Sequence, residues 1–79
     1  MLTITVFGPG CARCMETEKL VHQAVQQAGI AADVQKVSDI QAMAKAGVLL
    51  TPAVAINGVV KSSGRIPREE EIRNWIAGN

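Results

Sequence analysis

The chain has 79 residues, 48% of them hydrophobic and 3% aromatic, which suits one small domain over 1–79 with an aliphatic core. Its formal charge of +1 provides no extended basic field and argues against nucleic acid as the main partner. The N-terminal residues lack the pattern of a secretion signal, and no apolar stretch approaches membrane-spanning length. We therefore expect a cytoplasmic protein with no membrane partner.

The first part of the chain predicts a strand, a helix and a second strand. Apolar side chains alternate with threonines over 2–7, the two-residue period of a strand. From 11 to 28, apolar side chains recur every three or four positions, which predicts an amphipathic helix with Gly29 as its C′ residue. A weaker alternation over 31–37 indicates the second strand.

A short second helix follows from capping and apolar spacing. Ser38 and, three positions later, Gln41 have the pattern of a capping box, and Gly47 marks the end of the helix. The apolar face of this helix is expected to consist of Ile40, Met43 and Ala44.

The last part of the chain predicts a hairpin and a third helix. Residues 52–56 and 59–61 have strand character, and Asn57-Gly58 between them is typical of a type I′ turn. Pro67 suits the first turn of the final helix, where three successive glutamates complement the helix dipole. The buried stripe of this helix is expected to be Ile72, Trp75 and Ile76.

These elements have the order β-α-β-α-β-β-α and predict an α/β fold with a mixed four-stranded sheet flanked by three helices. The first two strands are joined through a helix, so they can lie parallel by a right-handed crossover. The hairpin then adds an antiparallel edge.

Cys11 and Cys14 are the only cysteines, and they lie where the first strand passes into the first helix. They can exchange electrons as a dithiol and disulfide, or they can hold a soft metal ion. A structural disulfide is disfavoured, because the cytoplasm is reducing and the closed loop contains only two residues. A C-x-x-C beside a βαβ pattern favours redox chemistry.

The helical spacing gives the two cysteines different roles. Unpaired backbone N–H groups at the helix N-terminus favour a thiolate at Cys11, which we expect to be the attacking nucleophile. Cys14 lies one turn further along, on the apolar stripe, and is expected to be the shielded resolving cysteine. Gly8 and Gly10 allow close backbone approach before the helix.

Two further side chains of this helix, Arg13 and His22, are candidates for a role in the chemistry. Arg13 is either a cation beside the thiolate or a solvated side chain. His22 lies too far along the helix to contact the cysteines and is interpreted as a surface residue. No nucleotide or flavin motif is visible, so the dithiol itself is the expected redox group, with no cofactor.

The C-x-x-C after the first strand, followed by Thr51-Pro52 before a hairpin, resembles the thioredoxin-like superfamily over essentially the full chain. It is most similar to the small, glutaredoxin-sized redox-active disulfide thioredoxins of archaea and anaerobic bacteria. The resemblance implies that Pro52 is cis and faces the C-x-x-C, and that the Thr51 backbone pairs with an extended substrate segment. Together with Gly10 and Arg13, these two residues make up the expected substrate-binding surface.

The chain departs from both well-known branches of this superfamily. Gly10 stands where typical thioredoxins have tryptophan, and their buried acid has no evident counterpart near the first strand. Arg13 replaces the aromatic residue of glutaredoxin motifs, and Gly64-Arg65 lacks the aspartate that accompanies glycine in glutathione sites. We therefore expect a monomer that reduces protein disulfides rather than glutathione, with a thioredoxin-reductase-like electron donor.

Two other classes of function compete with this interpretation. Small copper carriers of ferredoxin-like fold also have a C-x-x-C after their first strand, and thiolates select soft ions such as copper or metalloids. Their usual methionine is replaced here by Pro9, and this chain ends in a predicted helix rather than a strand. The other alternative is an interaction domain without activity, since fold alone does not establish catalysis. Redox activity is the favoured hypothesis.

Overall fold

A four-stranded sheet in the order β2-β1-β3-β4 forms the centre of the computed structural model, which describes residues 2–10 and 12–78. β1 and β2 are parallel, whereas the β1–β3 and β3–β4 pairs are antiparallel. The predicted element order and mixed sheet are thus confirmed. The four strands are β1 (Leu2–Phe7), β2 (Ala32–Val37), β3 (Ala53–Ile56) and β4 (Val59–Ser63).

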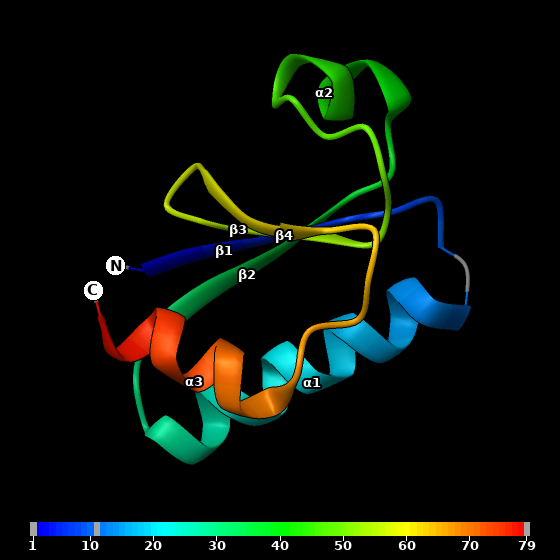
Figure 1. Cartoon of the computed structure of the whole chain (residues 1–79). Helices are drawn as coiled ribbons and strands as arrows, with labels where there is room; N and C mark the ends of the chain where they lie inside the picture. Colours follow the sequence, from blue (N-terminus) through cyan, green and yellow to red (C-terminus); the bar gives the residue numbers. More distant parts are fainter. Residues whose placement is uncertain (1, 11, 79) are drawn as a thin grey trace.

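The sheet separates two layers of helices. α1 (Ala12–Ala28) and α3 (Glu69–Ala77) cover one face, and the short α2 (Ile40–Lys45) lies on the other (Figure 1). Successive side chains of a strand point to opposite faces, so each layer has its own core. The core on the α1 and α3 face contains Ile4, Val6, Val21, Ala24, Val54, Ile56, Ile72 and Ile76. The smaller core on the α2 face contains Phe7, Met43, Val48, Ala53 and Ala55.

Two helix starts differ from the sequence prediction. The N-cap of α2 is Asp39 rather than Ser38, because its carboxylate accepts a hydrogen bond from the backbone N–H of Gln41 at 3.0 Å. Pro67 precedes α3 instead of lying in its first turn, since Arg68 is the N-cap. In both cases a carboxylate, of Asp39 or of Glu71, accepts a hydrogen bond from a backbone N–H at the start of the helix. The helix therefore begins later in the chain than the sequence pattern predicted. In α3, Trp75 is only partly buried, at the border of the larger core.

The predicted type I′ turn is confirmed by the positive φ angles of Asn57 and Gly58, 50° and 84°. Asn57 also attaches the turn to the start of β1. Its backbone N–H donates to Thr3 O at 2.8 Å, and its side-chain Oδ1 accepts from the Thr3 N–H at 2.9 Å. This reciprocal pair holds the hairpin in register with β1.

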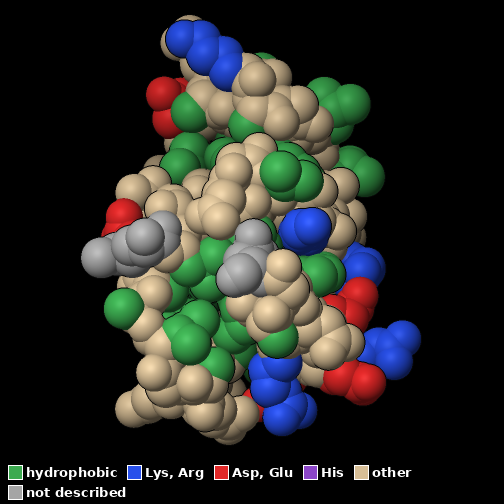
Figure 2. Space-filling model, turned by 90° about the vertical axis from the view of Figure 1, so that its left-hand side faces the viewer, with side chains coloured by type: hydrophobic (Ala, Val, Ile, Leu, Met, Phe, Trp, Pro, Cys, Tyr) green, Lys and Arg blue, Asp and Glu red, His purple; other side chains and the backbone are tan. Residues whose placement is uncertain are grey.

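The strand directions place four connections at one end of the sheet: β1–α1, β2–α2, α2–β3 and β4–α3 (Figure 1). The Asn57-Gly58 turn lies at the opposite end. Figure 2 views that opposite end, where hydrophobic side chains reach the surface among backbone and charged groups. Within residues 2–10 and 12–78, no helix has both the length and the apolar character needed to cross a membrane. Cys14 lies in the first turn of α1, directly after the β1–α1 connection, so the candidate site lies at the end where the four connections meet.

Candidate functional site

The Cys14 side chain is held inside the molecule at the start of α1. It is 1% exposed, as expected for a shielded second cysteine. A Cβ added to Gly8 would overlap Cys14 Sγ and come within 2.8 Å of its Cβ, so the sulfur packs directly against the Gly8 backbone. The Gly8 N–H donates to Val37 O at 2.9 Å and extends the β1–β2 ladder. Cys11 lies outside the described residues and directly precedes Ala12, the first residue of α1, in the sequence.

Thr51 and Pro52 lie directly before β3, at the same end of the sheet as Cys14. The peptide bond between them is cis, as the resemblance implied. Pro52 is buried and Thr51 is half-buried. The carbonyl oxygen of Pro52 accepts a hydrogen bond from the Gly64 N–H at 3.0 Å, which connects the start of β3 with the loop after β4.

Arg13 joins the motif to this second segment. Its Nη2 donates to the carbonyl oxygen of Gly64 at 3.3 Å, and the amide of the same Gly64 donates to Pro52. Two hydrogen bonds through Gly64 therefore connect Arg13 with Pro52. Arg13 is exposed, and one nitrogen of its guanidinium is hydrogen-bonded to backbone rather than only to solvent. Sequence reasoning missed this contact because Arg13 and Gly64 are 51 positions apart and no local signal relates them.

An apolar pocket of about 340 Å³ lies between the motif loop, α2 and the segment that leads to Pro52. It is open to solvent at an apolar rim, where Ile40 is 77% and Leu49 is 90% exposed. Ile40 and Ala44 were expected on the buried face of the helix, but both are exposed and line this pocket. α2 is short and buries only Met43. The pocket is lined by Pro9, Ile40, Met43, Ala44, Val48, Leu49 and Thr51.

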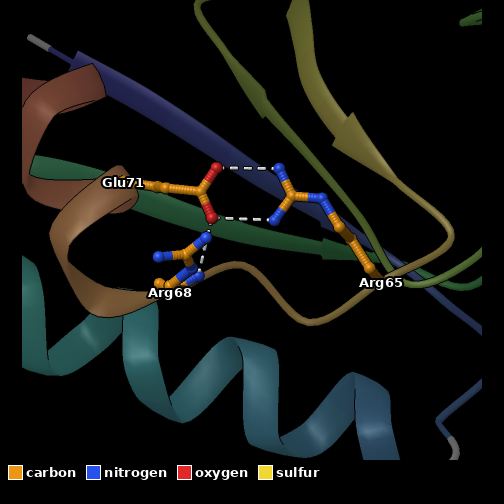
Figure 3. A network of polar contacts seen from close by, with 3 residues as sticks. All are labelled: Arg65, Arg68 and Glu71. Atoms are coloured by element: carbon orange, nitrogen blue, oxygen red, sulfur yellow. Dashed lines mark hydrogen bonds and ion pairs between the residues drawn. The ribbon is translucent and has the colours of Figure 1, made fainter.

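A charged network fixes the start of α3 (Figure 3). Arg65 donates from Nη1 and Nη2 to the two carboxylate oxygens of Glu71, each at 2.8 Å, and the Arg68 N–H donates to Glu71 Oε1 at 3.0 Å. The hydrogen bonds from Arg65 and then from Arg68 lower the pKa of Glu71 to about 2. Arg65 is thus neutralised by an internal partner. In contrast, no carboxylate of the described chain lies within ion-pair distance of Arg13.

The remaining candidates are at the surface. Gly10 is exposed in the loop before α1, and His22 is exposed on α1 as predicted. Among residues 2–10 and 12–78, no group of three or more His, Cys, Asp and Glu side chains is arranged to hold a metal ion.

The parallel β1–α1–β2 unit, the buried cysteine at the start of α1 and the cis-proline before β3 define a thioredoxin-like α/β protein. The sequence profile of the family described as "Thioredoxin domain" matches residues 2–77. The chain is 36% identical over 77 residues to a thioredoxin of Methanothermobacter thermautotrophicus, covering 98% of this chain and 100% of that protein. It is 41% identical over 76 residues to a thioredoxin of Methanocaldococcus jannaschii, covering 96% of this chain and 87% of that protein. The chain therefore belongs to the thioredoxin family of thiol-disulfide oxidoreductases.

Proposed function

We propose that this protein reduces disulfides in polypeptide substrates through a dithiol formed by Cys11 and Cys14. The observation that carries the proposal is the buried Cys14 sulfur, packed on Gly8 at the start of the helix that follows Cys11. A resolving cysteine needs this combination of shielding and proximity, because it must attack its neighbour rather than external disulfides.

The exchange takes place in two steps. The Cys11 thiolate attacks one sulfur of the substrate disulfide; a Cys11–substrate disulfide forms, and the other substrate sulfur leaves as a thiolate that takes up a proton. Cys14 then loses its proton and attacks the Cys11 sulfur, forming the Cys11–Cys14 disulfide and releasing the second substrate thiolate. Two electrons pass to the substrate. A separate thioredoxin-reductase-like donor returns two electrons to the protein, and no further cofactor takes part.

The substrate segment is proposed to run past the end of the sheet, with the Thr51 backbone pairing to it beside Pro52 and with Gly10 leaving room for its approach. The neighbouring pocket supports this assignment, since Pro9 and Thr51 line it together with α2. Its occupant would be a bulky apolar side chain close to the substrate disulfide. Glutathione has no such side chain, so the pocket favours polypeptides. The protein acts in the cytoplasm as a monomer in this proposal.

The proposal is tested by an equilibrium redox titration with thiol alkylation and mass readout. The wild type should cycle through an intramolecular disulfide, and Cys14→Ser should accumulate a mixed disulfide with a model peptide. Cys11→Ser should accumulate none. If the wild type forms no intramolecular disulfide, the proposal fails.

Two other outcomes would change the assignment. Trapping by Cys11→Ser but not by Cys14→Ser would reverse the roles of the two cysteines. Tight stoichiometric Cu(I) binding without disulfide reduction would instead favour a soft-metal carrier.

A further inference from the structure

We infer that the preferred substrates carry an acidic residue close to the disulfide and that Arg13 recognises it. The inference rests on the proposed function and concerns which polypeptides the site selects. Arg13 is the residue directly before Cys14, and its side chain lies at the end of the sheet that carries the Pro52 segment.

The guanidinium of Arg13 is held in place before any substrate binds. Nη2 donates to Gly64 O at 3.3 Å, and the Gly64 amide is itself bonded to Pro52 O at 3.0 Å. A cation fixed in this way loses less side-chain freedom on binding than a solvated one. Gly64 in turn connects it with Pro52, beside which the substrate backbone is expected to lie.

The charge of Arg13 is available to a ligand. A guanidinium has five N–H donors in a planar fork that matches a carboxylate, and the structure gives one of these donors to Gly64. Arg65, the next residue after Gly64, has both of its terminal nitrogens bonded to Glu71. Along α1, Glu16 lies three positions after Arg13, but the described chain contains no ion pair between them. Of the two arginines Arg13 and Arg65, therefore, only Arg65 has a carboxylate partner in the described part of the chain.

The two sides of the site differ in chemistry. The apolar pocket is on the α2 side of the sheet, whereas Arg13 belongs to α1 on the other side (Figure 1). A substrate segment that crosses this end of the sheet can place an apolar side chain in the pocket and a carboxylate at Arg13. Because one contact is apolar and the other is charged, the site would select both the residues of the substrate segment and the direction in which the segment runs.

The test uses disulfide peptides that are identical except for one residue beside the reacting cysteine, which is Glu, Gln or Lys. The wild-type dithiol should reduce the Glu peptide about two- to five-fold faster than the Gln peptide, the range expected for one exposed ion pair. The Lys peptide should be slowest. The differences should shrink in 1 M salt, where screening acts over about 3 Å.

Variants assign the preference to its residue. Arg13→Gln should reduce the Glu and Gln peptides at equal rates, and Arg13→Lys should keep part of the preference because it keeps the charge without the fork. Arg73→Gln is the matched control, since it removes an exposed cation from α3 and should leave the preference unchanged. Circular dichroism would confirm that the three variants are folded.

Equal rates for the Glu and Gln peptides with the wild type, or a preference that persists in Arg13→Gln, would overturn the inference while leaving the proposed function intact. Failure to reduce any of the peptides would overturn both. Glutathione carries carboxylates but no bulky apolar side chain. If glutathione disulfide were reduced as fast as the Glu peptide, the pocket would not contribute to selection, and the assignment to polypeptides would be overturned.

Discussion

The Cys14 side chain occupies the space that any residue larger than Gly8 would need for its own side chain. Gly8 is tied to Val37 by a backbone hydrogen bond, and Cys14 is part of α1, which packs on β1 and α3. Neither partner can move away without disturbing the sheet or the helix. The buried Cys14 sulfur can therefore take this position because residue 8 is a glycine, which has no side chain.

Gly8→Ala should lower the free energy of unfolding of the reduced protein by about 1–3 kcal/mol, the usual cost of overpacking. It should also slow the release of substrate from the mixed disulfide, because Cys14 must shift. Urea denaturation and quenched-flow alkylation measure the two effects. The control is Gly78→Ala, where the added Cβ would make only ordinary contacts, the nearest at 3.4 Å. Equal behaviour of the two variants would contradict this account.

Leu49→Ser should weaken substrate binding without weakening the fold. The side chain is 90% exposed, so its loss should change stability by less than about 0.5 kcal/mol. The KM for a peptide with an apolar side chain should rise roughly tenfold, since one apolar contact in a binding pocket contributes about 1–3 kcal/mol. Steady-state kinetics would measure this rise. Val59→Ser, 58% exposed at the far end of the sheet, should leave KM unchanged, and a similar rise there would argue against the pocket.

Asn57→Ala should destabilise the hairpin by about 1–3 kcal/mol, because it places alanine at a positive φ and leaves the Thr3 N–H without the side-chain acceptor. Asn57→Asp should lose less, since it keeps an acceptor and tolerates this backbone conformation. Thermal denaturation of both variants measures whether Asn57→Asp is more stable than Asn57→Ala. The rate of peptide reduction should not change, because the turn lies at the end of the sheet opposite the site. An equal loss in both variants would exclude the hydrogen bond as the cause.

Glu71 makes stability depend on pH in a defined direction. Its pKa falls from 4.5 to about 2 in the folded protein, chiefly through the hydrogen bond from Arg65. The ionised carboxylate therefore stabilises the fold above about pH 4.5, and this contribution is lost as the pH falls from 4.5 towards 2. Urea denaturation at a series of pH values should show wild type more stable than Glu71→Gln at pH 6, with the difference shrinking by pH 2.5. A difference that does not change with pH would contradict the assignment.

The sequence predicted the order of elements correctly because that order depends on local periodicity and turn chemistry. The threonine alternation of β1, the spacing of α1 and the Asn57-Gly58 pair each act within a few residues. Helix boundaries were less predictable. The choice between Ser38 and Asp39 as a cap depends on which side-chain oxygen reaches a free amide, and a pattern of residue types does not contain that geometry.

The candidate site was predictable in part. The burial of Cys14 follows from its place on the apolar stripe of α1, and the cis Pro52 was implied by resemblance. The contact between Arg13 and Gly64 depends on the packing of distant elements, so no local pattern indicates it. The pocket was missed for a related reason: apolar spacing predicts a buried face for Ile40, but the six-residue α2 buries only Met43, and Ile40 lines the pocket.

The strand order leaves β2 and β4 at the two edges of the sheet, where unpaired backbone groups could recruit another chain. β2 presents exposed Asp33 and Lys36, and β4 presents exposed Lys61 next to an irregular register with β3. Charged side chains and bulges make an edge a poor template for an added strand. We therefore expect neither edge to add a strand from another chain, so that the proposed substrate segment would meet the sheet at its end and not along an edge.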